Sequence, residues 1–142
     1  MIKLNTYLNF NGNTEQVFTF YKKIFGGDFT TLMRFADMPG SEKMTDEDKE
    51  KIMHVALPVG EQDVLMGTDV MESMNQRLNP GDNFSISISL DNEAEAIRIF
   101  EVLSAGGQVI MPLGKEFWSD LFGICKDQFG IQWMINYNKI KE

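Results

Sequence analysis

The stretch YLNFNGNTEQVFTFYKKIFGG (residues 7–27) decides the fold, because the chain repeats its pattern 80 residues later. Apolar and polar side chains alternate in its first residues, which predicts a half-buried strand. Asn13-Thr14-Glu15-Gln16 has the form of a capping box, which predicts that a helix begins there. Gly26-Gly27 is the expected end of this helix. Its expected inward face consists of Val17, Phe20, Tyr21 and Ile24.

A second strand and helix match the first at an offset of 80 residues. The matched helix positions are Gly26-Gly27 with Gly106-Gly107, Phe20 with Phe100, and Val17 with Ile97. The second helix is expected to begin at 91–95 and to turn inward Ala96, Ile99, Phe100 and Leu103. The matched strand positions are the apolar Leu4, Leu8 and Phe10 with Phe84, Ile88 and Leu90, and the polar Asn5, Tyr7 and Asn9 with Ser85, Ser87 and Ser89. This agreement indicates a repeated supersecondary unit.

Three further strands are expected after each helix. They are 29–35, 52–59 and 63–68 in the first half, and 108–113, 117–126 and 130–137 in the second. Each half is therefore an expected strand-helix-strand-strand-strand (βαβββ) module of the α+β class, with one sheet face covered by its helix and one left open. We expect a single domain over 1–142, with module 1 at about 1–69, a linker at 70–83 and module 2 at about 84–138. The charged insert 36–51 is expected to contain a short helix from Thr45.

Composition and charge exclude several classes of function. The formal net charge of −8 argues against a nucleic-acid or anionic-membrane surface, because both need clustered Lys and Arg. No apolar run reaches the length of a membrane span, and no signal peptide is evident. The single cysteine, Cys125, excludes an internal disulfide and favours a reducing, cytoplasmic location. We expect Cys125 to be an inert thiol and the partner to be a small molecule.

Several ordered segments carry a resemblance to a known family: YLNFNGNTEQVFTFYKKIFGG, RFADMPG, IMHVALPVG, LMGTD, NFSISISL and FWSDLFGICKDQFGIQWMINY. The chain resembles the vicinal oxygen chelate superfamily, which holds glyoxalase I, extradiol dioxygenases and bleomycin-resistance proteins. More narrowly, it is similar to the PhnB-like branch, whose members often carry the label 3-demethylubiquinone-9 3-methyltransferase. The resemblance covers essentially the whole chain. It implies two βαβββ modules around an open cleft, and a homodimer, because members commonly build their clefts across subunits.

The resemblance also implies where a metal site would lie. In metal-using members the ligands are typically His or Gln, then His, then Glu, facing the cleft. These positions fall on Asn5, Ser85 and Met134 here, with Met66 as a further position on the last strand of module 1. Zinc, iron and manganese need imidazole, carboxylate or thiolate ligands. We therefore expect no metal site.

The methyltransferase label implies a site for S-adenosylmethionine. A Rossmann-type cofactor site needs a glycine-rich turn between a strand and a helix. Gly26-Gly27 and Gly106-Gly107 instead stand at the ends of helices. We therefore expect no S-adenosylmethionine binding, and no cofactor is predicted.

The sequence offers candidate ligand-binding residues, each beside an alternative interpretation. His54, the one histidine, is a candidate general base or metal ligand, although a hydrogen-bonded structural histidine is the favoured interpretation because no Asp or Glu stands beside it on its strand face. Polar groups that could orient a ligand are Asn5, Tyr7, Asn9, Ser85, Ser87, Gln132 and Asn136; a water-filled cleft or a subunit interface is their alternative role. Candidate walls and an anion anchor are Trp118, Phe117, Phe122, Arg34 and Phe35, which could otherwise close the sheet ends and pair with a surface carboxylate. Met66 and Met134 are expected to face the pocket, and Trp133 the core.

Two main hypotheses about function follow. The first is metal-independent binding of a small apolar or aromatic molecule in the cleft, by analogy with bleomycin-resistance members. The second is an enzyme of the glyoxalase or dioxygenase type with a relocated metal site around His54. A third possibility is an interaction protein whose acidic segment 41–51 docks a partner, although such a charge run is more often a solvated face.

Overall fold

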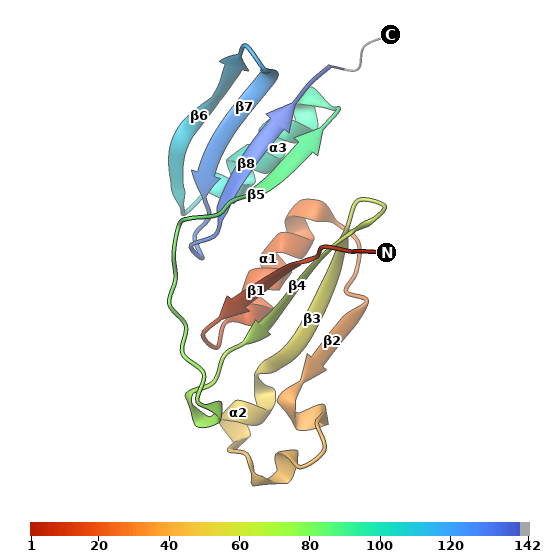
Figure 1. Cartoon of the computed structure of the whole chain (residues 1–142), viewed down its shortest axis with the longest axis vertical. Helices are drawn as coiled ribbons and strands as arrows, with labels where there is room; N and C mark the ends of the chain where they lie inside the picture. Colours follow the sequence, from red (N-terminus) through yellow and green to blue (C-terminus); the bar gives the residue numbers. More distant parts are fainter. Residues whose placement is uncertain (140–142) are drawn as a thin grey trace. The chain divides into compact units, whose positions relative to one another are not determined.

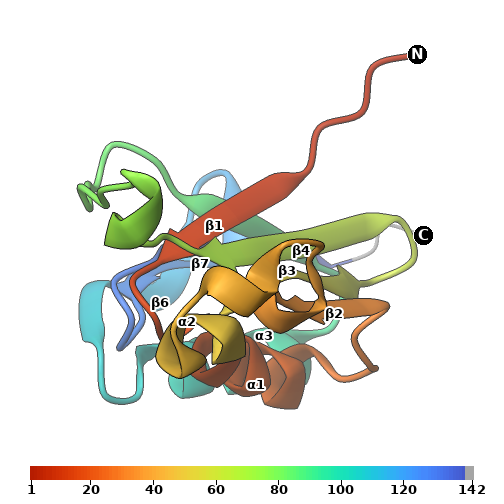
Figure 2. The ribbon, with the colours of Figure 1, turned by 90° about the horizontal axis from the view of Figure 1, so that it is seen from below.

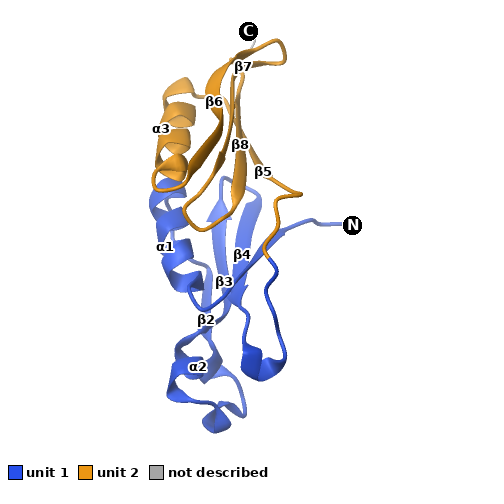
Figure 3. Ribbon diagram, turned by 90° about the vertical axis from the view of Figure 1, so that its left-hand side faces the viewer, with its two compact units in different colours: residues 1–79 blue, residues 80–142 orange. Residues whose placement is uncertain are grey.

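The computed structural model describes residues 1–139. The chain divides into two compact units, residues 1–79 (unit 1) and residues 80–142 (unit 2), as coloured in Figure 3. Each unit contains one four-stranded mixed sheet and one long helix. This confirms the predicted α+β architecture of two βαβββ modules. The division at Asn79 falls inside the predicted linker 70–83.

Unit 1 has the strand order β1-β4-β3-β2, in which β1 runs parallel to β4 and the other neighbours are antiparallel. Its elements are β1 (Thr6–Phe10), α1 (Thr14–Phe25), β2 (Thr31–Arg34), α2 (Asp46–Glu50), β3 (Ile52–Val59) and β4 (Asp63–Asp69), with 3₁₀ turns at Phe35–Asp37, Ser41–Lys43 and Glu72–Met74 (Figure 1). The Thr45 side chain accepts a hydrogen bond from the Asp48 N–H at the start of α2, which confirms the predicted short helix in the insert.

Unit 2 repeats this plan with the strand order β5-β8-β7-β6, and β5 runs parallel to β8. Its elements are β5 (Ile86–Leu90), α3 (Glu93–Ser104), β6 (Gln108–Glu116), β7 (Ser119–Lys126) and β8 (Gln132–Tyr137). In Figure 3, α1 and α3 each lie against one face of the sheet of their own unit. The opposite face of each sheet, which we call its open face, is covered by no helix of its unit.

A glycine lets each helix pack closely on its sheet. A Cβ atom on Gly67 in β4 would lie 2.5 Å from the Phe18 ring of α1, and a Cβ atom on Gly123 in β7 would lie 2.8 Å from the Phe100 ring of α3. Phe18 is completely buried, although the predicted inward face of α1 omitted it. The four residues predicted to face inward on the second helix are all buried, which confirms that helical pattern.

The 80-residue offset describes the strands but not the helices. β1 and β5 are related by 80 residues, whereas α1 and α3 are related by 79, because the β5–α3 connection is one residue shorter than the β1–α1 connection. The predicted match of Val17 with Ile97 is therefore wrong: Val17 is fully buried and Ile97 is 39% exposed. Leu4 and Phe84 were expected in the core with their neighbours, yet both precede their strands and are 92% and 50% exposed. Figure 2 shows the N-terminal residues running on beyond β1.

The start of α1 is capped differently from the sequence expectation. Asn13 makes no side-chain capping hydrogen bond, so the predicted capping box is wrong. The buried carboxylate of Asp69, at the end of β4, accepts hydrogen bonds from the Gly12 and Thr14 N–H groups, both at 3.0 Å, and from the Thr14 hydroxyl at 2.6 Å. Its other oxygen accepts from the Ile52 N–H at 2.8 Å. One side chain thus joins the starts of α1 and β3 to the end of β4.

Candidate functional site

The open face of unit 1 carries uncharged polar, thioether and imidazole side chains. Alternation along β1 and β4 buries Leu8, Phe10 and Leu65 on the helix side and leaves Tyr7, Asn9, Met66 and Thr68 on the other. In the sheet register Tyr7 lies opposite Met66, and Met33 on β2 lies opposite His54 on β3. Asn5 is exposed and precedes β1.

A contact between Tyr7 and His54 joins the two sides of this face. The Tyr7 hydroxyl lies 3.0 Å from His54 Nδ1, and the two rings are stacked with centroids 5.6 Å apart and planes inclined by 29°. Since β4 lies between β1 and β3, the two side chains meet across the width of a strand. Partial burial raises the pKa of the Tyr7 phenol. The sequence placed both residues on one face, and the structure brings them into hydrogen-bond contact.

The open face of unit 2 is also uncharged in its middle. Ser87 lies opposite Met134, and Ser89 lies opposite Asn136. The Gln132 amide donates a hydrogen bond of 2.6 Å to the Ser85 hydroxyl, so these two candidate residues bind each other. The Asn136 Oδ1 atom is buried without a hydrogen-bond partner. A buried acceptor of this kind favours a ligand or water that donates a hydrogen bond.

Aromatic side chains extend the face of unit 2. Phe122 lies opposite Asn136 in the register and is 8% exposed. Its ring meets Trp118 edge to face at 5.4 Å, and Trp118 meets Phe117 edge to face at 4.7 Å. Trp118 is 47% exposed and Phe117 is 97% exposed. Trp118 therefore presents a half-exposed aromatic surface, whereas Trp133, as predicted, is buried in the core.

The positions where relatives hold a metal ion do not fit one here. The registers pair β4 with β8 so that Met66 and Met134 occupy equivalent places in the two units. Both carry thioethers, and Asn5 and Ser85 offer neutral oxygens, none of which suits a divalent zinc, iron or manganese ion. Within residues 1–139, no three His, Cys, Asp or Glu side chains are grouped to hold a metal. A divalent site around His54 would need donors from elsewhere.

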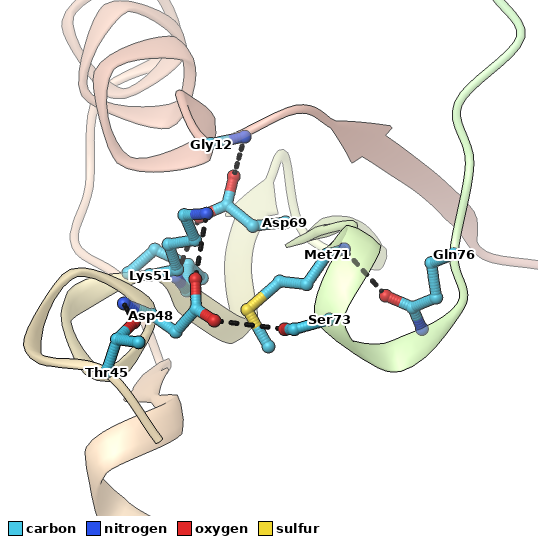
Figure 4. Close-up of polar contacts among 9 residues, drawn as sticks. Gly12, Thr45, Asp48, Lys51, Asp69, Met71, Ser73 and Gln76 are labelled. Carbon is cyan, nitrogen blue, oxygen red and sulfur yellow. Dashed lines mark hydrogen bonds and ion pairs between the residues drawn. The ribbon is translucent and has the colours of Figure 1, made fainter.

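A cavity of about 870 Å³ lies within unit 1 around the start of α1, and the sequence did not point to it. Its wall includes the carboxylates of Glu15, Glu47, Asp48, Glu50, Asp69 and Glu72. Figure 4 shows how Asp48 holds this region together: it pairs with Lys51 at 3.1 Å and accepts a hydrogen bond from the Ser73 hydroxyl at 3.0 Å. The surplus of negative charge disfavours anionic ligands in this cavity.

Arg34 lines the same cavity. Its guanidinium pairs with Glu15 at 2.5 Å and donates to the Glu50 carbonyl at 2.8 Å. The hydrogen bond to Glu15 raises the pKa of the Arg34 side chain. The structure thus gives Arg34 the carboxylate partner that the alternative interpretation expected, and away from the aromatic residues of unit 2 with which it was grouped.

Cys125 is buried in the core of unit 2. Burial raises the pKa of its thiol to about 11. An unfolded cysteine has a pKa of about 8.5. The neutral thiol therefore stabilises the fold fully below pH of about 8.5, and this contribution is lost as the pH rises towards 11.

We expect native Cys125 to react with iodoacetamide at pH 8 at least about 100-fold more slowly than the same thiol in urea, since alkylation requires the thiolate. Mass spectrometry over time measures both rates. Equal rates in the two states would contradict the buried, protonated thiol.

Among residues 1–139, no helix has both the length and the apolar character required to cross a membrane. This agrees with the sequence, which offers no run of that length.

Comparison with known proteins places this geometry among relatives. The sequence profile described as Glyoxalase/Bleomycin resistance protein/Dioxygenase superfamily matches residues 3–135. Protein PA1353 from Pseudomonas aeruginosa is 37% identical, with a TM-score of 0.86 over 99% of this chain and 100% of that one. The PhnB protein from Bacillus cereus, which carries the 3-demethylubiquinone-9 3-methyltransferase label, is 25% identical, with a TM-score of 0.76 over 96% of this chain and 100% of that one. Protein YjdN from Escherichia coli (strain K12) is 28% identical over 96% of this chain and 95% of its own length.

Proposed function

Because the chain belongs to the Glyoxalase/Bleomycin resistance protein/Dioxygenase superfamily, we propose that it binds a small, largely apolar or aromatic molecule without the help of a metal ion. The observation that carries this proposal is the chemistry of the two open faces. Met66 and Met134 occupy equivalent central positions, and uncharged polar groups surround them. Flexible thioethers adapt to apolar ligands, and a few polar groups fix their orientation.

The competing hypothesis, a metal-dependent glyoxalase or dioxygenase centred on His54, is less well supported. Its hydrogen-bond partner is Tyr7, and a phenol is a poor substitute for the carboxylates and imidazoles that divalent ions prefer. Nothing in the methyltransferase label of the Bacillus cereus relative adds a cofactor site to this chain.

We also propose that the chain acts as a homodimer, as its resemblance to dimeric relatives implies. Apolar side chains with high exposure support this proposal. They include Leu4 and Phe84, at matched positions before the first strand of each unit, and Val109 and Ile110 in β6. An additional subunit would remove such side chains from water, which is favourable by roughly 25 cal/mol per Å² of buried apolar surface.

A thermal-shift screen with aromatic and quinone-like compounds tests the binding function, with calorimetry for each compound that stabilises the chain. We expect at least one compound to raise the melting temperature, and Trp118→Ala to weaken its binding about 10-fold, since a half-exposed tryptophan gives a large apolar contact. Ile97→Ala, at an exposed position on α3, is the control and should bind as the wild type does.

No stabilisation by any compound would contradict this function. A stoichiometric divalent metal in the purified chain, lost in His54→Ala, would favour the enzyme instead. Sedimentation equilibrium of the same samples distinguishes a dimer from a monomer.

A further inference from the structure

We propose that Tyr7 and His54 form the polar recognition point of the open face of unit 1, and that His54 Nε2–H donates a hydrogen bond to an oxygen of an aromatic ligand. The ligand class is an aromatic ring that carries a carbonyl or carboxylate group. This inference rests on the proposed function and assigns to it the chemistry of one contact.

The first step is the direction of the contact between the two side chains. The phenol hydroxyl lies 3.0 Å from Nδ1, which is hydrogen-bond distance. Partial burial raises the pKa of Tyr7, so its hydroxyl keeps its proton at neutral pH. A phenol that donates to Nδ1 places the proton of a neutral imidazole on Nε2. A protonated imidazole carries a proton on Nε2 as well. Nε2 is therefore a donor in both charge states.

The second step is what surrounds His54. Met33 lies directly opposite it on β2, and Ala56 is the next residue on the same face of β3. Met66 lies opposite both Ala56 and Tyr7. Within residues 1–139 no ion pair joins His54 to a carboxylate. A half-buried donor among thioether and methyl groups has few protein acceptors to satisfy it, so it selects a ligand that brings an acceptor oxygen.

The third step is the ligand body. Two thioethers and the stacked Tyr7 and His54 rings, 5.6 Å apart, favour a flat, polarisable group over a hydrated one. The acceptor oxygen then decides between ligands of equal apolar area. A carboxylate and a carbonyl share this chemistry, and the carboxylate gives the stronger hydrogen bond because it is charged.

Because the chain contains one histidine, ¹⁵N-labelled protein gives the signals of a single imidazole, and NMR reports its tautomer directly. At a pH where the imidazole is neutral, we expect the Nε2–H tautomer in the wild type. Tyr7→Phe removes the donor to Nδ1 and should make the Nδ1–H tautomer detectable. The probe is 1-naphthoate, and 1-methylnaphthalene is the matched compound without oxygen. We expect naphthoate to bind about 10-fold more tightly and to shift the Nε2 signal.

His54→Leu keeps an apolar side chain and removes the donor. It should abolish the advantage of naphthoate and leave 1-methylnaphthalene binding unchanged. An Nδ1–H tautomer in the wild type, or naphthoate binding that is equal in wild type and His54→Leu, would overturn the inference while the proposed function stands. If neither compound binds and no compound of the wider screen does, the proposed function fails together with the inference.

Discussion

Replacing Asp69 with alanine is expected to lower the free energy of unfolding by about 3–5 kcal/mol, because it leaves buried donors without their acceptor. The Asp69 side chain is 2% exposed. Its two oxygens accept four hydrogen bonds, from the N–H groups of Gly12, Thr14 and Ile52 and from the Thr14 hydroxyl. Alanine removes every one of these acceptors, and the buried cavity offers no protein group to replace them.

Urea denaturation monitored by circular dichroism measures this loss. Asp69→Asn retains one amide oxygen and should lose less than alanine does, since half of the acceptor set survives. Asp63→Ala is the matched control, because Asp63 is an exposed aspartate on the same strand. We expect Asp63→Ala to change the free energy of unfolding by less than about 0.5 kcal/mol. A loss below about 1 kcal/mol in Asp69→Ala would show that the helix start does not depend on this carboxylate.

The same variant should also disturb the open face of unit 1. Ile52, whose N–H binds Asp69, begins β3 two residues before His54, and the bound Gly12 follows β1, which carries Tyr7. Asp69 therefore fixes the relative position of the two strands that hold the Tyr7–His54 contact. The stability of the fold and the geometry of the proposed recognition point depend on one buried group.

Periodicity was sufficient to predict most elements of the fold. The predicted strand 52–59 coincides with β3, and the inward face of α3 was correct. Both depend on side chains close together in the sequence, and a repeating apolar pattern records them. The error in matching Val17 with Ile97 has a different origin. A connection shorter by one residue shifts a helix by 100° about its axis while the strand before it stays in place.

Contacts between distant residues were beyond the reach of the sequence. Asp69 binds residues 55 and 57 positions away, and Tyr7 meets His54 across 47 positions. The strand parity placed Tyr7 and His54 on open faces, but only the sheet order β1-β4-β3 makes them neighbours. The resemblance to relatives led to Met66 and Met134, whereas the cavity beside α1 has no sequence motif, because its wall comes from several separate loops and helix ends.

Replacing Asp127 with alanine is the second substitution with a large expected effect, a loss of about 2–4 kcal/mol in the free energy of unfolding. Asp127 is 3% exposed and stabilises the turn before β8. One oxygen accepts from the Phe129 and Ile131 N–H groups at 2.9 and 3.0 Å, and the other accepts from the indole Nε1–H of Trp133 at 2.9 Å. Alanine therefore leaves a buried indole donor and two backbone donors unpaired.

Trp133 reports this change directly when Trp118→Phe is the background, because the chain contains only these two tryptophans. Asp127→Ala should shift the Trp133 emission and lower the urea midpoint together, whereas Asp91→Ala, at an exposed aspartate of unit 2, should do neither. Since Trp133 lies opposite Cys125 in β7, loosening of this turn should also speed alkylation of the Cys125 thiol. An unchanged emission spectrum with unchanged stability would mean that packing alone holds Trp133, because the indole would then need no carboxylate to remain in the core.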